Sequence, residues 1–280
     1  FMENGWHLHV ANQFFFKEYT ITAGGNDFST DKSSLVVPAF YAVMKMDRLA
    51  LFGAYTIPAG GGGLEYDNGV PGAYVENPAL VAFITGSVPG ATNAIVSSAN
   101  LKAFSMYHGA TLGGAFAITK QISVSLSGRF VFAKQEMTGR ADYMILGGAS
   151  HGTIFPGSPE LDVELKAYGF GGIIGCDIKL SEQLNIGLRF ETPTALEFDV
   201  TVYDGNGFGM YTDGDKQTKD LPGVIAAGIS FKPVKQLNIG LAFMYYLIKA
   251  ADGDAYDNYD NGFDISIGVE FAVTPDLFIS

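Results

Sequence analysis

The chain has 280 residues, is 48% hydrophobic and 13% aromatic, and contains 36 glycines but only 16% charged residues. A chain this hydrophobic can bury a core, which excludes intrinsic disorder, and a net charge of −12 leaves no basic surplus for nucleic-acid phosphates. Cys176 is the only cysteine, which excludes an intramolecular disulfide framework and a cysteine-based zinc site.

Alternation with a period of two residues is the dominant sequence pattern. In the segment 237–247 every second side chain is large and apolar, whereas Asn238, Gly240 and Ala242 between them are polar or small. The segments 122–130, 184–191 and 263–271 show the same pattern, and the motif LNIGL occurs at 184 and again at 237. Because a strand places alternate side chains on opposite faces, each segment has one apolar face and one polar or small face.

In chain order, the alternation predicts about eleven strands, at 5–22, 33–46, 48–57, 104–118, 121–136, 162–179, 183–202, 220–232, 236–249, 262–273 and from 277. Short polar turns alternate with longer Gly- and Asp-rich connections along the chain. This arrangement is typical of a transmembrane up-and-down antiparallel β-barrel, with tight turns at one rim and long loops at the other. We therefore expect residues 1–280 to form a single all-β barrel domain.

The segment 76–102 interrupts this pattern. It is apolar and carries no charge between Glu76 and Lys102, but Gly86, Pro89 and other breakers make it unsuitable as a spanning helix. We expect a long extracellular loop over 58–103 that contains short apolar helices.

The direction of the apolar face decides the class of protein. The second face carries mainly glycine, serine and alanine with few charges, which would be a poor exterior in water but suits the lining of a narrow polar lumen. The sequence therefore favours a barrel whose apolar face contacts lipid and whose backbone groups are paired by closure. A soluble β protein remains an alternative.

The order of these elements resembles the FadL/TodX-type outer-membrane proteins, which take up long-chain fatty acids and, in relatives, aromatic hydrocarbons. The resemblance covers nearly the whole chain: GWHLHVANQFFF from Gly5, LALFGAYTIPAGGGG from Leu49, the segment 165–193, and the segment 219–246 with its Leu-Pro pair at the start of a strand. It implies a bacterial outer-membrane location and a fourteen-stranded barrel plugged by an N-terminal hatch. In that comparison this sequence begins at about the first strand and stops in about the eleventh, so we expect it to be a barrel without the hatch and the last strands.

Strand three runs into Pro58, Gly60 and Gly61, residues that remove ladder donors or weaken a strand. The resemblance implies a kinked third strand whose kink opens a lateral exit for ligand. An ordinary start of a loop is the other interpretation.

The long loop supplies a second candidate site. Exposed apolar residues in a long loop indicate a binding surface, and the resemblance implies that the outer loops capture ligand in an apolar groove. The candidates are Leu80, Val81, Phe83, Ile84, Ile95 and Leu101. They could instead only pack the loop onto the rim.

Four charged residues are expected on the lumen side: Arg129, Arg189, Glu191 and Glu270. The arginines could contact a ligand carboxylate through charge-assisted hydrogen bonds. Pairing with Glu191, Glu270 or the hatch is the favoured alternative.

Enzymatic and metal chemistry find little support in the sequence. Ser105 and His108 are three residues apart and so fall on opposite faces of a strand, and the acidic run from Asp252 to Asp260 lacks EF-hand spacing. We expect no catalytic residues, no metal and no cofactor.

The sequence therefore favours a passive outer-membrane channel for hydrophobic small molecules such as long-chain fatty acids, present as a monomer among outer-membrane lipids. Ligand would be captured by extracellular loops and released through the kinked third strand or to the periplasm. A general or structural porin-like barrel without an apolar ligand remains the alternative, and a membrane-embedded hydrolase is a more distant one.

Overall fold

The computed structural model describes residues 3–23, 26–30, 33–66, 82, 85–155, 161–206, 211–253, 256, 258–274 and 277–279. Its main feature is one large antiparallel sheet, and a separate hairpin is formed by β2 (Thr20–Ala23) and β3 (Asn26–Ser29). No helix among the described residues is long and apolar enough to cross a membrane.

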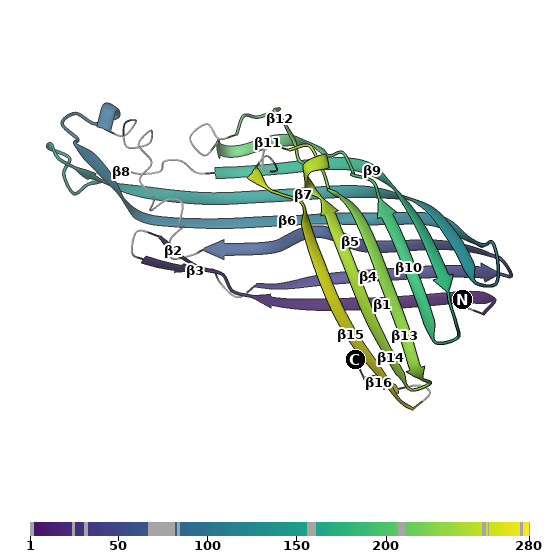
Figure 1. Ribbon diagram of the computed structural model, residues 1–280. Helices are drawn as coiled ribbons and strands as arrows, with labels where there is room; N and C mark the ends of the chain where they lie inside the picture. The colour runs from purple at the N-terminus through teal and green to yellow at the C-terminus, as the bar shows by residue number, and fades with distance from the viewer. Residues whose placement is uncertain are drawn as a thin grey trace.

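The strands of the large sheet follow one another in chain order (Figure 1). The first half contains β1 (Gly5–Lys17), β4 (Ser33–Met46), β5 (Leu49–Tyr66), β6 (Asn93–Ala117), β7 (Ile122–Leu146) and β9 (Leu161–Lys179). The second half contains β10 (Leu184–Glu191), β13 (Gly223–Val234), β14 (Leu237–Leu247), β15 (Gly262–Thr274) and β16 (Leu277–Ile279). Three short elements join this path from the side: β8 (Ile154–Phe155) pairs with β7, β11 (Glu197–Asn206) pairs with β9, and β12 (Lys216–Thr218) pairs with β11.

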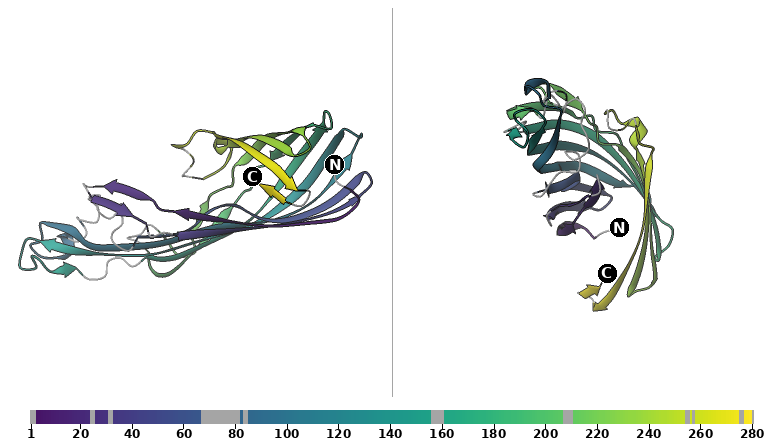
Figure 2. Two further views of the ribbon diagram at one scale, coloured as in Figure 1. Left: turned by 90° about the horizontal axis from the view of Figure 1, so that it is seen from below. Right: turned by 90° about the vertical axis from the view of Figure 1, so that its left-hand side faces the viewer.

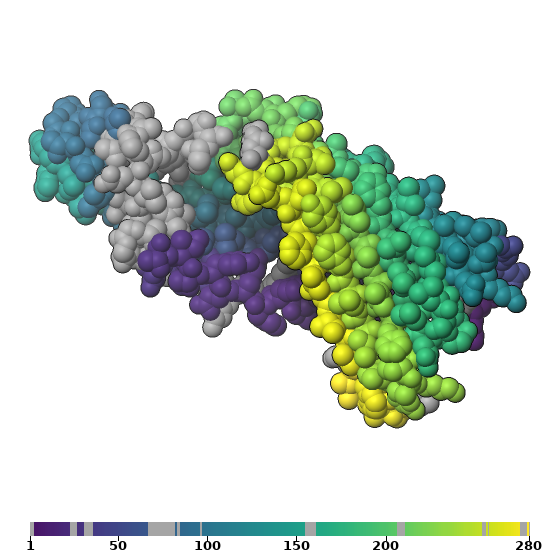
Figure 3. Space-filling view, in the orientation of Figure 1, coloured from purple at the N-terminus to yellow at the C-terminus, as the bar shows by residue number. Residues whose placement is uncertain are grey.

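The sheet curls into a trough, as the end-on view in Figure 2 shows. Its two edges are β1 on one side and β15 with β16 on the other, and no pairing joins these edges among the described residues. Figure 3 shows the inside of the trough as a hollow between the purple β1 side and the yellow β15 ridge. The predicted all-β class with an up-and-down antiparallel order is therefore confirmed.

The two faces of the sheet are different in character. Large apolar side chains are strongly exposed on the outer face, among them Val10 (75%), Leu112 (75%) and Phe170 (77%). The alternate positions are small or buried, and Val131 and Ala133 of β7 are completely buried. Alternation along each strand produces this division, since neighbouring side chains point to opposite faces.

The larger of two buried clusters among the described residues lies on the inner face of the sheet, and the smaller one joins Ala94 of β6 to Tyr143 and Ile145 of β7. Tyr107 and Val131 from β6 and β7, together with Val163 and its neighbours in β9, pack against Phe198 and Val200 of β11. The larger cluster therefore lies in the part of the sheet where β11 pairs with β9.

Several predicted boundaries are wrong. The strands β5 and β6 extend over 58–66 and 93–103, so the predicted loop over 58–103 shrinks to a connection of 67–92. The two strands pair with each other here, from Glu65 with Lys102 to Ala59 with Tyr107. These backbone hydrogen bonds keep β5 extended although it contains a run of glycines. Similarly β7 continues to Leu146 instead of ending at 136, because its upper part pairs with the start of β6. The first strand is shorter than predicted, because β1 ends at Lys17 rather than at residue 22.

The predicted strand over 183–202 is also wrong, because the structure breaks it into β10 and β11. Pro193 lies in the break and has no backbone N–H for a sheet ladder, which ends the regular pairing there.

Candidate functional site

The most distinctive feature of the wall is a split between β4 and β5. Their pairing runs from Met46 with Leu49 to Phe40 with Tyr55 and goes no further, although both strands continue. Beyond this point β5 pairs only with β6, whereas β4 still pairs with β1 as far as Ser33. The wall is therefore opened on one side of β5 along the segment 56–66 (Figure 1).

The split coincides with two irregularities in β5. The register against β6 shifts between Thr56 and Ala59 and again between Ala59 and Gly62. Pro58 lies in the first irregularity, and Gly60, in the second, has a φ of +111°, which side chains with a Cβ rarely adopt. A Cβ at Gly60 would also lie 2.6 Å from the carbonyl oxygen of Ser105. The close approach and the backbone angle thus require glycine at this position.

A hydrogen bond crosses the split. The ammonium group of Lys17, the last residue of β1, donates to the carbonyl oxygen of Gly61. This contact ties the bulged part of β5 to β1, although β4 lies between them in the strand order.

Three of the four predicted lumen charges come together. Arg129 of β7 lies with its Nη1 atom 2.7 Å from Glu191 Oε2, and Arg189 Nε lies 3.1 Å from Glu191 Oε1. The side chain of Glu191 is buried, that of Arg129 is only 11% exposed, and that of Arg189 is half exposed. The fourth residue, Glu270, is exposed on β15 and is separate from this cluster.

The Arg129–Glu191 pair joins two strands that are not neighbours. It links β7 to β10 across β9, where Gly171 is the register partner of Arg129. Because Gly171 has no side chain, the inner face of β9 is open at this position. The side chain of Thr194 also lies there, since a Cβ on Gly171 would be 2.5 Å from Thr194 Oγ1. Removing one partner of such a pair destabilises the fold, because the other charge is then left in the interior without compensation.

A second polar junction closes the region where β10 and β11 separate. The buried carboxylate of Asp220 accepts hydrogen bonds from the backbone N–H groups of Leu196 (3.0 Å) and Asp252 (3.2 Å). Its carbonyl oxygen accepts a third from the Tyr256 hydroxyl (2.7 Å). Asp220 therefore fastens three segments of the wall that no continuous strand joins.

The predicted loop groove is only partly visible. Leu80, Val81, Phe83 and Ile84 lie outside the described residues. Ile95 is exposed and Leu101 packs against the buried core, and both belong to β6 rather than to a loop.

An aromatic belt on the outer face was not recognised from the sequence. The hydroxyl of Tyr55 lies 2.6 Å from His108 Nδ1, His108 stacks on Phe132, and Phe132 stacks on Tyr168. These residues come from the four successive strands β5, β6, β7 and β9. Each was visible as an aromatic or histidine on an alternating strand, but only the register shows that they adjoin.

The aromatic belt marks one limit of the apolar band, so the height of the band can be calculated along β7. From Ile122 to Phe132, β7 advances ten residues, which is about 34 Å at ~3.4 Å per residue. A tilt of ~40° reduces this length to a height of about 26 Å, close to the ~25 Å apolar band of outer-membrane barrels. Aromatic residues flank such bands at the level of the lipid headgroups.

An apolar exterior of this height, an aromatic belt and a curled up-and-down sheet define the protein as a membrane β-barrel protein. No protein-family model and no curated sequence match the chain. Its fold does match solved channels. A Pseudomonas putida toluene transporter, TodX, matches with 14% identity and a TM-score of 0.58 over 98% of this chain and 72% of the other.

Two further structures show the same fold. A Pseudomonas aeruginosa FadL homologue matches with 13% identity and a TM-score of 0.60, over 96% of this chain and 67% of the other. A TodX deltaS2S3 mutant, described as a monoaromatic hydrocarbon channel, matches with 12% identity and a TM-score of 0.65, over 99% and 73%. The resemblance to FadL/TodX-type proteins is thus confirmed at the level of the fold, which is that of bacterial outer-membrane channels. These structural neighbours are transport proteins rather than enzymes.

Proposed function

We propose that this chain forms a passive outer-membrane channel that lets hydrophobic small molecules leave sideways through the wall. The observation that carries the proposal is the split between β4 and β5 at the bulges of β5. A closed ladder keeps an apolar solute inside a polar lumen, whereas an interrupted ladder gives it a direct route to the lipid. The shared fold with a toluene transporter and a monoaromatic hydrocarbon channel supports this class of solute.

The proposed route has three parts. The connection between β5 and β6 captures ligand with the apolar residues Leu80, Val81, Phe83 and Ile84, aided by Ile95. Ligand then enters the trough and leaves beside Pro58, Gly60 and Gly61 or continues to the periplasm. No energy source or cofactor is needed, because an apolar solute moves down its own gradient into lipid.

The ends of the strands set the orientation. Tight turns such as Asp47–Arg48 join the strands at one end, and the long connections lie at the other. We place the tight turns in the periplasm and the long connections outside, the usual arrangement for such barrels. The protein acts as a monomer, with outer-membrane lipid around its apolar face.

Uptake of three labelled solutes tests the proposal: a long-chain fatty acid, toluene, and a small hydrophilic sugar. Liposomes or cells that contain the full chain should take up one or both apolar solutes at least about tenfold faster than empty ones, with no gain for the sugar. Equal acceleration of the sugar would instead indicate a general pore, and no acceleration of either apolar solute would refute the proposed function.

A further inference from the structure

The upper part of β1 and β4 forms a two-stranded ribbon at the edge of the large sheet. This upper ribbon consists of residues 13–17 of β1 and 33–37 of β4, which pair with each other. The pairing of β4 with β5 has already ended at Phe40 with Tyr55, so no strand pairing joins the upper ribbon to β5 among the described residues. A ribbon of only two strands is marginally stable by itself. The upper ribbon is therefore the part of the wall beside the split that moves most easily.

Two prolines lie at the root of the split, one on each strand. The last pair of β4 with β5 is Phe40 with Tyr55. Two residues further along each strand, Pro38 of β4 would face Ile57, and Pro58 follows directly. Proline has no backbone N–H to donate to a ladder. Backbone pairing therefore does not readily extend from the closed part of the wall into the split, and the upper ribbon needs another contact to stay near β5.

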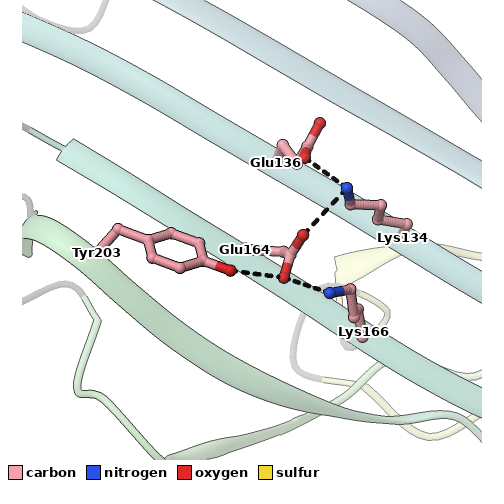
Figure 4. A network of polar contacts seen from close by, with 5 residues as sticks. All are labelled: Lys134, Glu136, Glu164, Lys166 and Tyr203. Carbon is pink, nitrogen blue, oxygen red and sulfur yellow. Dashed lines mark hydrogen bonds and ion pairs between the residues drawn. The ribbon is translucent and has the colours of Figure 1, made fainter.

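The strands on the other side of β5 are held together by side chains at the same level. Met106 of β6 lies against Gly60 and is the register partner of Lys134 in β7. A polar network joins β7, β9 and β11 there (Figure 4), and its members are Lys134, Glu136, Glu164, Lys166 and Tyr203. Its centre is the buried carboxylate of Glu164, which lies 3.0 Å from Lys134 Nζ. Movement of the wall at this level is therefore easiest on the β4 side of β5.

Lys17 supplies a contact across the split that backbone pairing does not. Its ammonium group donates to the carbonyl oxygen of Gly61 and lies 5.7 Å from the centre of the Tyr19 ring. Phe14 and Phe16 are strongly exposed on the outer face of the upper ribbon. Because Lys17 is an odd number of residues away from both, its side chain starts on the inner face. The contact with Gly61 is therefore made from the trough side of the split, whereas the outer face of the upper ribbon is apolar.

We propose that Lys17 is a latch that sets the width of the lateral exit. While its hydrogen bond to Gly61 is formed, the upper ribbon lies close to β5 and only small apolar solutes pass. When the bond breaks, the ribbon swings away from β5 about the two prolines, and bulkier apolar solutes pass. A single hydrogen bond contributes modestly to stability, so the latch opens and closes readily. The inference rests on the proposed function, because it concerns the width of the exit on which that function depends.

Distances between spin labels test the latch without any transport measurement. The full chain in lipid vesicles, with the single cysteine Cys176 replaced by alanine, carries labels at Phe16→Cys of β1 and Gly63→Cys of β5, on either side of the split. A control pair at Leu8→Cys and Leu51→Cys joins the same two strands below the split, where β4 pairs with both. Pulsed electron paramagnetic resonance measures both distances. The first pair reports on the split, and the control pair reports on any general loosening of the sheet.

Two lysines on this pair of strands provide matched variants. Lys17→Met removes the ammonium group but keeps an extended side chain, Lys17→Arg keeps a cationic donor, and Lys45→Met changes a lysine of β4 where β4 still pairs with β5. Lys17→Met should lengthen the distance across the split by about 5 Å, which is one strand spacing. Lys17→Arg and Lys45→Met should keep the wild-type distance, and the control pair should be unchanged in all three variants.

Uptake of toluene and of the bulkier pyrene tests the selection by size. Lys17→Met should speed the entry of pyrene about twofold to tenfold, the range expected when one hydrogen bond no longer favours the closed exit. The entry of toluene should change by less than about twofold, because the narrow exit already admits it. Lys17→Arg and Lys45→Met should take up both hydrocarbons at the wild-type rate.

An unchanged distance across the split in Lys17→Met, the same lengthening in Lys45→Met, or an equal change in the control pair would overturn the latch. Equal acceleration of pyrene and toluene would overturn the selection by size. A wild-type chain that admits no apolar solute contradicts the proposed function, whereas a transporting chain whose label distances do not respond to Lys17→Met contradicts the latch alone.

Discussion

Replacing Gly60 by valine should close the split between β4 and β5 and block release of hydrophobic solute. The backbone of Gly60 has a φ of +111°, and a Cβ there would lie 2.6 Å from Ser105 O and 2.8 Å from Met106 Cα. Both neighbours are backbone atoms, so no side chain can rotate away to make room. Valine at this position therefore strongly disfavours the bulged form of β5.

The size of the effect follows from the backbone. A residue with a side chain in such a sparsely populated conformation costs about 1–3 kcal/mol before any steric contact is counted. Since ~1.4 kcal/mol corresponds to a factor of ten, the population of the bulged strand should fall about fivefold to 150-fold. Adding Gly61→Thr favours a regular strand further, because β-branched residues suit extended pairing.

The assay compares Gly60→Val and the double variant with Gly63→Val in the same strand. A Cβ at Gly63 meets no atom within 4 Å, so this control adds the same side chain without disturbing the bulge. Uptake of labelled toluene and fatty acid is measured beside the yield of folded protein, which is read from the mobility shift between boiled and unboiled samples.

We expect folded yield within about twofold for all variants and uptake reduced about tenfold or more only when Gly60 is replaced. Normal uptake by a folded Gly60→Val variant would refute the lateral exit. Equal loss in Gly63→Val would show that bulk in this strand, rather than the bulge, is responsible.

Three further predictions concern the polar junctions. Glu191→Gln should lower the free energy of unfolding by about 3–5 kcal/mol, because it leaves the buried Arg129 charge without its partner; denaturant titration in lipid vesicles measures this, and a loss below ~1 kcal/mol would contradict it. Asp220→Ala should cost about 3 kcal/mol, because two backbone N–H groups lose a charged acceptor, and Asp220→Asn, which keeps one acceptor, should cost less in the same titration. The Lys249 ammonium, 2.5 Å away, lowers the pKa of the Asp260 carboxyl, so this ion pair persists above that pKa and is lost as the pH falls through it. Carboxyl titration by NMR should place the pKa of Asp260 higher in Lys249→Gln, and an unchanged pKa would exclude the contact.

Some parts of the candidate site could be predicted from the sequence. The alternation places Arg129, Arg189 and Glu191 on one face, and pairing of the arginines with Glu191, Glu270 or the hatch is the favoured interpretation. The meeting of Arg129 with Glu191 across β9 could not be predicted, because it depends on the stagger of three strands and on Gly171 lying between them.

The bulge in β5 shows a similar limit. Pro58 and the glycines after it marked an irregular place, and a kinked strand was one of two interpretations. The sequence did not show that β5 continues to Tyr66, because a run of four glycines has no strand periodicity of its own. Pairing with the upper half of β6 supplies the missing order, and that pairing joins residues about 40 positions apart.

The amino-acid sequence by itself determined the class of structure: alternating strands, an apolar face outside, and tight turns alternating with long connections. These properties are local, because they depend on side chains two residues apart on one strand. Only the tertiary structure decided where the wall opens, which charges meet, and that an aromatic belt crosses four successive strands. Those features depend on register between strands, and register is set by hydrogen bonding and packing over the whole sheet rather than by any single segment.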